Sequence, residues 1–153
     1  MKIEVVTIYE EIKVIGLSYR KLGLPETIES INKMWSIYGE EYRGKISNAV
    51  EPLMDYGVNA DLPTVKDEYI AGCAVTEIGD LDENWESFII PPGKYIKHTR
   101  NKIDDLFTYA DDVWEWAELN HIKLGDGCMV EVYPMGAFDN SGAEVYTLRP
   151  VQL

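Results

Sequence analysis

The stretch Met129-Val130-Glu131-Val132-Tyr133 has the alternation of a β-strand and places one carboxylate in an otherwise apolar run. Alternate side chains of a strand point to opposite faces, so Val130 and Val132 share one face, the expected core face. The opposite face carries Met129, Glu131 and Tyr133. A carboxylate beside an aromatic ring and a thioether suits a pocket for a lipophilic cation, because rings attract cations and the carboxylate supplies the counter-charge. The alternative is that Glu131 faces water on a half-exposed antiparallel sheet.

The sequence around this stretch repeats one order of elements. In the first half, alternation and apolar stripes predict a strand, a helix and two strands, over 12–20, 26–39, 53–58 and 69–78. In the second half the same order is expected over 85–99, 103–119, 128–133 and 143–148, with the first strand interrupted by a turn or bulge at Pro91-Pro92-Gly93. We therefore predict an α+β fold in which a β-α-β-β unit is duplicated with pseudo-twofold symmetry. Both helices should pack on one side of a sheet. No linker separates the repeats, about 5–80 and 83–153, so a single domain over 1–153 is expected.

Both predicted helices carry an aromatic residue on their apolar stripe. Trp35 and Trp114 occupy these positions, and we expect both to be mostly buried in the core. Part of each ring could also form the floor of a cleft between the halves. Trp116 lies off the second stripe and is expected at the surface or in an interface.

Composition narrows the classes of function. The formal net charge is −13, which repels nucleic acid and anionic membranes and attracts cations. We therefore expect no direct nucleic-acid partner and no membrane association. The N-terminus lacks the pattern of a signal peptide, and a cytoplasmic location is expected. Cys73 and Cys128 are predicted as buried thiols, and His98 and His121 are isolated in the sequence, so neither a metal site nor a cofactor is expected.

Several short motifs of this sequence, which follow one another as they do in the family, resemble the GyrI-like effector-binding domain family. The most specific are the proline-glycine element Ile90-Pro91-Pro92-Gly93-Lys94-Tyr95 and the strand Val130-Glu131-Val132-Tyr133. The supporting pieces are Val14-Ile15-Gly16-Leu17-Ser18 with Tyr19-Arg20, the Trp35 helix, Tyr56-Gly57-Val58 and Tyr69 to Val75. The resemblance covers nearly the whole chain. Family regulators also carry a helix-turn-helix module, for which this chain has no room.

The resemblance implies a central ligand cleft between the halves and a buried glutamate that faces lipophilic cationic ligands. In this sequence that glutamate is Glu131. The candidate ligand-binding residues are Glu131, Tyr133, Tyr56, Trp85, Trp35 and Tyr95. Three of them keep a second interpretation: Trp35 as core, Tyr56 as core or cleft, and Tyr95 as a residue that holds its turn.

The leading hypothesis is a protein that binds a hydrophobic, cationic or aromatic small molecule, for sensing or sequestration. One alternative is a hydrolase of strained cyclopropane-bearing toxins, as some free-standing members of the resembled family are. Glu131 would then act as general base or position water, and Tyr133 or Tyr56 would orient the substrate. Another alternative is that the protein binds a protein partner, as an inhibitor module of the topoisomerase-inhibiting type. The sequence does not decide whether the protein is an enzyme, and it assigns no catalytic residue.

Overall fold

The structure, a computed structural model, describes residues 2–60, 68–100, 110–125, 128–135, 137 and 144–152. Within these residues, eight strands and two helices alternate in two similar halves. The first half comprises β1 (Lys2–Ile8), β2 (Ile12–Ser18), α1 (Ile28–Ile37) with a π-helical turn η1 (Tyr38–Tyr42), β3 (Met54–Ala60) and β4 (Glu68–Val75). The second comprises β5 (Trp85–Ile90), β6 (Gly93–Arg100), α2 (Ala110–Leu119), β7 (Cys128–Pro134) and β8 (Val145–Pro150).

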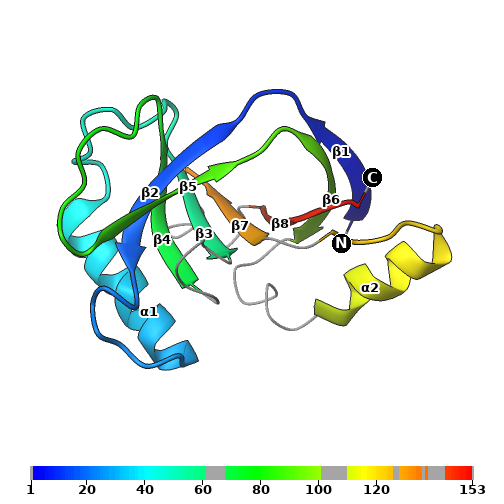
Figure 1. The fold of residues 1–153 in the computed structure, drawn as a ribbon, viewed down its shortest axis with the longest axis horizontal. Helices are drawn as coiled ribbons and strands as arrows, with labels where there is room; N and C mark the ends of the chain where they lie inside the picture. The colour runs from blue at the N-terminus through cyan, green and yellow to red at the C-terminus, as the bar shows by residue number, and fades with distance from the viewer. Residues whose placement is uncertain are drawn as a thin grey trace.

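All eight strands form one antiparallel sheet in the order β1-β6-β8-β7-β3-β4-β2-β5. Each strand of the first half has a counterpart in the second half, from β1 with β5 to β4 with β8. Exchanging every strand with its counterpart gives the same order read from the opposite edge of the sheet. The sheet therefore has the predicted pseudo-twofold symmetry, and the pair β3–β7 lies at its centre. Figure 1 shows β1 with β2, and β5 with β6, arching across one side of the sheet. The predicted α+β fold is confirmed.

The repeating unit contains one strand more than the sequence predicts. In the first half β1 precedes the expected strand and pairs with β6 across the halves. In the second half, 85–99 is two strands, not one interrupted strand. β5 pairs with β2 at one edge, whereas β6 pairs with β1 and β8 near the other edge. Pro91 and Pro92 lie between these strands, where their lack of a backbone N–H removes no hydrogen bond from the sheet.

Helix α1 packs on the sheet through one narrow stripe. Thr27 caps its N-terminus by accepting a hydrogen bond from the Ser30 amide. Ser30, Met34 and Tyr38 are buried at intervals of four residues against β2 and β4. Trp35, at the margin of the stripe, is only partly buried. The helix begins at Ile28, two residues later than predicted.

Helix α2 packs on the same face of the sheet, but not in the predicted orientation. Val113 and Ala117 contact Ile96 of β6, and Trp116, expected at the surface or in an interface, is partly buried beside them. Trp114 is 55% exposed, so the expectation of burial is wrong. Trp114 follows the buried Val113 by about 100° around the helix, so its side chain points away from the packed face of α2. The Arg149 guanidinium lies 5.9 Å from its ring centre. The expected first turns of this helix, 103–109, lie outside the described residues.

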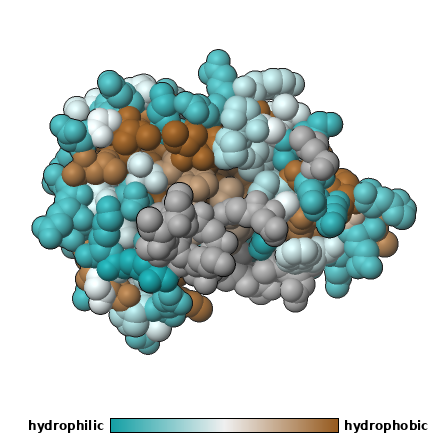
Figure 2. Space-filling view, viewed as in Figure 1, coloured by the Kyte–Doolittle hydropathy of each residue, from teal (hydrophilic) through white to brown (hydrophobic). Residues whose placement is uncertain are grey.

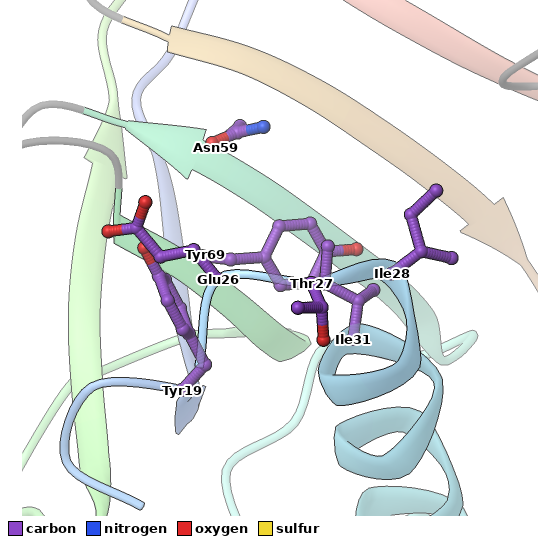
Figure 3. A pocket seen from close by; sticks show the side chains of 7 residues that line it. All are labelled: Tyr19, Glu26, Thr27, Ile28, Ile31, Asn59 and Tyr69. Carbon is purple, nitrogen blue, oxygen red and sulfur yellow. The ribbon is translucent and has the colours of Figure 1, made fainter. Parts of the chain in front are cut away.

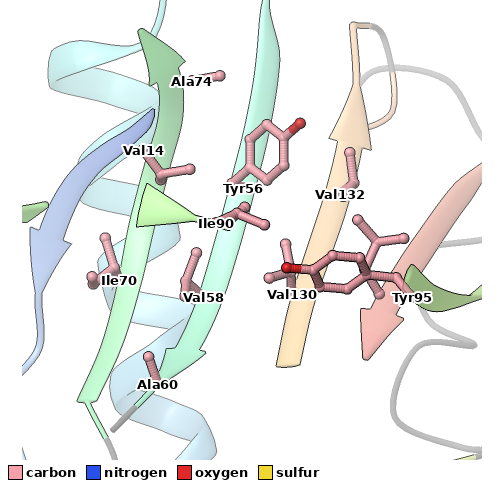
Figure 4. Packing of buried hydrophobic residues seen from close by; sticks show 11 residues of the cluster. Val14, Tyr56, Val58, Ala60, Ile70, Ala74, Ile90, Tyr95, Val130 and Val132 are labelled. Carbon is pink, nitrogen blue, oxygen red and sulfur yellow. The ribbon is translucent and has the colours of Figure 1, made fainter. Parts of the chain in front are cut away.

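The opposite face of the sheet carries one continuous apolar core. Its side chains come from both halves and include Val14, Val58, Ile70, Val130 and Val132 (Figure 4). The face shown in Figure 2 gathers hydrophobic residues near its middle and hydrophilic residues around them. The face of residues 129–133 that carries Val130 and Val132 is therefore the core face, as predicted, and Glu131 lies on the helix side.

Neither described helix is long and apolar enough to cross a membrane.

Candidate functional site

Glu131 lies at the centre of the sheet and is almost completely buried, with 1% of its surface exposed. Two phenols donate hydrogen bonds to the same carboxylate oxygen, Oε1: Tyr133 at 2.6 Å and Tyr69 at 2.7 Å. The indole Nε1 of Trp35 in turn donates to the Tyr69 hydroxyl at 3.0 Å. The rings of Trp35 and Tyr133 meet edge to face, 5.1 Å between centres. We call these four residues, Trp35, Tyr69, Glu131 and Tyr133, the Glu131 cluster.

The environment of Glu131 opposes its ionisation. Burial raises the pKa of this carboxyl, and the hydrogen bonds from Tyr133 and Tyr69 lower it only in part. Burial and the neighbouring carboxylate also raise the pKa of both phenols, so they stay protonated and act as donors. In the part of the chain that the structure describes, no basic side chain forms an ion pair with Glu131.

A second buried carboxylate on the same face is satisfied in a different way. Asp55 of β3 is paired in register with Tyr133. It accepts a hydrogen bond from Tyr38 at 2.7 Å and forms an ion pair with Arg43, Nε to Oδ2, also at 2.7 Å. The fold thus supplies an internal cation to Asp55, whereas Glu131 has two neutral donors. The two buried carboxylates therefore differ in that only Asp55 has a described basic partner.

A pocket of about 310 Å³ adjoins the cluster. Figure 3 shows the Tyr69 ring among the side chains that line it, from the β2 end, the start of α1 and β3. The other lining residues are Tyr19, Glu26, Thr27, Ile28, Ile31 and Asn59. One ring therefore contacts this pocket with its surface and Glu131 with its hydroxyl. Among the described residues, no group of His, Cys, Asp and Glu is arranged to hold a metal ion.

Three of the six predicted ligand-binding residues come together: Glu131, Tyr133 and Trp35. The other three do not join them. Tyr56 is paired with Val132 and lies in the core on the opposite face of the sheet (Figure 4). Tyr95 lies in that same core and donates its hydroxyl proton to the Pro91 carbonyl at 2.6 Å, so it holds its turn.

Trp85 is on the helix face of the sheet, but it lies far from Glu131. It belongs to the edge strand β5, which β3, β4 and β2 separate from β7. Its ring packs against Tyr42 of η1, 5.0 Å between centres. The strand prediction for this residue was correct, but its position depended on which strand it pairs with.

Tyr69 is the member of the cluster that sequence reasoning missed. It is the second residue of a strand in which every side chain is buried, so nothing in the local pattern separates it from core residues. Its contact with Glu131 joins residues 62 positions apart. Only the register of β3 with both β4 and β7 brings them together.

We expect Glu131→Gln to stabilise the protein at neutral pH, by on the order of 1 kcal/mol. The folded-state pKa of Glu131 is raised, so the wild type loses stability as pH increases from the ordinary value of 4.5, and glutamine does not. Glutamine can still accept both phenolic hydrogen bonds at Oε1. Urea unfolding of both proteins between pH 4 and 8 would measure this. A difference that stays constant with pH would contradict the destabilising effect of the buried carboxylate.

The comparison with family models gives the class of this protein, an effector-binding protein. The chain belongs to the family described as "Cass2: Integron-associated effector binding protein", whose model matches residues 6–148. Among curated proteins, none matches the chain in sequence.

Solved structures share the fold at low sequence identity. The EcmrR C-terminal domain has 18% identity and a TM-score of 0.68, covering 99% of this chain and 97% of that one. SAV2435 bound to tetraphenylphosphonium has 11% identity and a TM-score of 0.66, covering 99% and 94%. The integron cassette protein VCH_CASS2 of Vibrio cholerae has 15% identity and a TM-score of 0.59, covering 98% and 95%.

Proposed function

We propose that this protein binds a lipophilic organic cation, with Glu131 as its counter-charge and the rings of Trp35, Tyr69 and Tyr133 as its apolar contacts. The observation that carries the proposal is a buried carboxylate whose hydrogen-bond partners are two neutral phenols. A buried anion without a cation is unfavourable, and an aromatic cation relieves that cost. The net charge of −13 adds a long-range attraction for positive ligands.

The identity of the relatives supports the same chemistry. The family is one of effector-binding proteins. SAV2435, which shares the fold, has been solved with tetraphenylphosphonium, a cation whose charge is enclosed by four aryl groups. Such an ion has no N–H or O–H group and needs no hydrogen-bond acceptor, but it gains from aromatic surface and a nearby anion. The biological role would be sensing or sequestration of such a compound.

Glu131→Gln tests this proposal. We expect it to weaken tetraphenylphosphonium binding at least about tenfold, because the isosteric amide removes the counter-charge and keeps the shape. Binding of the neutral analogue triphenylphosphine oxide should change much less. Titration calorimetry at pH 8 would measure both affinities.

Glu68→Gln is the matched control. Glu68 is also a buried glutamate, but on β4 it is paired with Ala60 and faces the core on the other side of the sheet. This variant should leave the affinity for tetraphenylphosphonium unchanged. Equal weakening of the cationic and the neutral ligand by Glu131→Gln would instead indicate an effect of shape, and the proposed role of the charge would fail.

Hydrolysis is the second candidate function. It is favoured by the raised pKa of Glu131, which suits a general base, and by phenols that could orient a substrate. Turnover of a cyclopropane-bearing substrate by the wild type, lost in Glu131→Gln, would favour it. Stoichiometric binding without product would favour the binding protein.

A further inference from the structure

Tyr69 and Glu131 meet across an intervening strand. Tyr69 belongs to β4 and Glu131 to β7, and β3 lies between them. Neighbouring strands are about 4.8 Å apart, so the two backbones are separated by roughly 10 Å. The side chains must therefore pass over β3 to form their 2.7 Å hydrogen bond.

The residue of β3 beneath this hydrogen bond is Gly57. Its register partners are Glu131 on β7 and Ala71 on β4. A Cβ atom at position 57 would lie 2.3 Å from the Tyr69 hydroxyl oxygen and 2.5 Å from Glu131 Oε1. It would also lie 3.1 Å from Tyr69 Cζ. Even one methyl group is thus incompatible with the hydrogen bond as it stands.

This position is also the centre of the symmetric sheet. Gly57 is the middle residue of β3, Glu131 is the middle residue of β7, and the two are directly paired. The two halves therefore contribute different residues at the centre. One half supplies the carboxylate, and the other supplies the space that it and Tyr69 occupy.

We propose that Gly57 is a positioning residue of the ligand site: its missing side chain keeps open the space in which Tyr69 reaches Glu131. The inference rests on the proposed function, since its effect is measured on cation binding. Gly57 itself contacts no ligand in this proposal. It acts through Tyr69, and a larger residue would force the phenol and the carboxylate apart.

The pH dependence of binding distinguishes positioning from a general loss of structure. The Tyr69 hydrogen bond lowers the pKa of Glu131, so its loss should move the ionisation of Glu131, and with it cation binding, to higher pH. Among the described residues, the other titratable or charged groups on this face include Tyr133, Asp55 with its partners Arg43 and Tyr38, Cys73, Arg149, and His98 and Arg100 of β6 beyond Thr147. Burial and Arg100 lower the pKa of His98 to about 4, so it is neutral above that pH.

The experiment compares Gly57→Ala, Tyr69→Phe and the double variant with the wild type, using tetraphenylphosphonium between pH 5 and 9. Each single variant should weaken binding about tenfold at pH 6, the scale of one lost hydrogen bond to a charged group. Both should move the pH midpoint of binding upward by the same interval. The double variant should show no further shift, because both changes remove the same contact. Gly125→Ala is the control: its Cβ would make ordinary contacts of 3.4–3.5 Å, and binding should not change.

The outcomes separate the inference from the function on which it rests. If Gly57→Ala keeps the affinity and the pH midpoint of the wild type while Glu131→Gln loses cation binding, the inference is overturned and the proposed function is not. Unchanged cation binding in Glu131→Gln would overturn the proposed function. If Gly57→Ala fails to fold, Tyr69→Phe should restore folding, since it removes the nearest atom. Failure of the double variant, with Tyr69→Phe alone folded, would overturn the inference.

Discussion

Gly72→Ala is expected to destabilise the protein by more than about 3 kcal/mol, because the new methyl group would overlap the backbone of a neighbouring strand. Gly72 of β4 is paired with Gly16 of β2. A Cβ atom at position 72 would lie 1.8 Å from the Ile15 carbonyl oxygen and 2.5 Å from the Gly16 Cα. These are backbone atoms, which cannot move aside as a side chain can. The two strands would have to separate at this pair of glycines.

Thermal unfolding would measure this effect. For a chain of this size, 3 kcal/mol corresponds to a decrease in Tm of about 10 °C. Gly57→Ala is the informative comparison, because its new methyl group would meet side-chain atoms, and so should cost less stability while perturbing the site. An equal loss of stability in the two variants would contradict the distinction between a glycine that shapes the fold and one that shapes the site.

Asp55→Ala should also be strongly destabilising, by about 3 kcal/mol. The substitution leaves the Arg43 guanidinium without its carboxylate and the fully buried Tyr38 hydroxyl without its acceptor. Because Tyr38 packs edge to face against Trp35, we expect ligand affinity to decrease as well. Urea unfolding at pH 7 would measure the stability.

Asp55→Asn is the matched variant for this prediction. It retains an acceptor for Tyr38 and loses only the charge opposite Arg43, so it should cost less than alanine. The contrast with Glu131→Gln is the sharper test, because the two buried carboxylates lie on one face of the sheet. Neutralising the carboxylate that has an internal cation should destabilise the protein, whereas neutralising Glu131 should stabilise it. A stabilising Asp55→Asn would contradict this assignment.

The amino-acid sequence by itself determined the local elements and the faces that they present. Alternation in 129–133 placed Val130 and Val132 in the core and Glu131 opposite, because strand geometry is set by neighbouring residues. The repeated order of strands and helices predicted the pseudo-twofold sheet. The stripe of α1 correctly turned Trp35 toward the sheet, although the residue is only partly buried and not mostly buried as predicted. These inferences needed only periodicities of two and about four residues.

Only the tertiary structure decided which of the aromatic residues surround Glu131. Tyr56 and Tyr69 look alike in sequence, yet strand parity and pairing place the first on the far face and the second on the carboxylate. Trp114 was expected in the core and is exposed, whereas Trp116 is partly buried, because the orientation of α2 depends on what it packs against. The space above Gly57 is invisible in sequence. It exists because three strands from different parts of the chain pair in register, and registers between distant segments are set by the packing of the whole sheet.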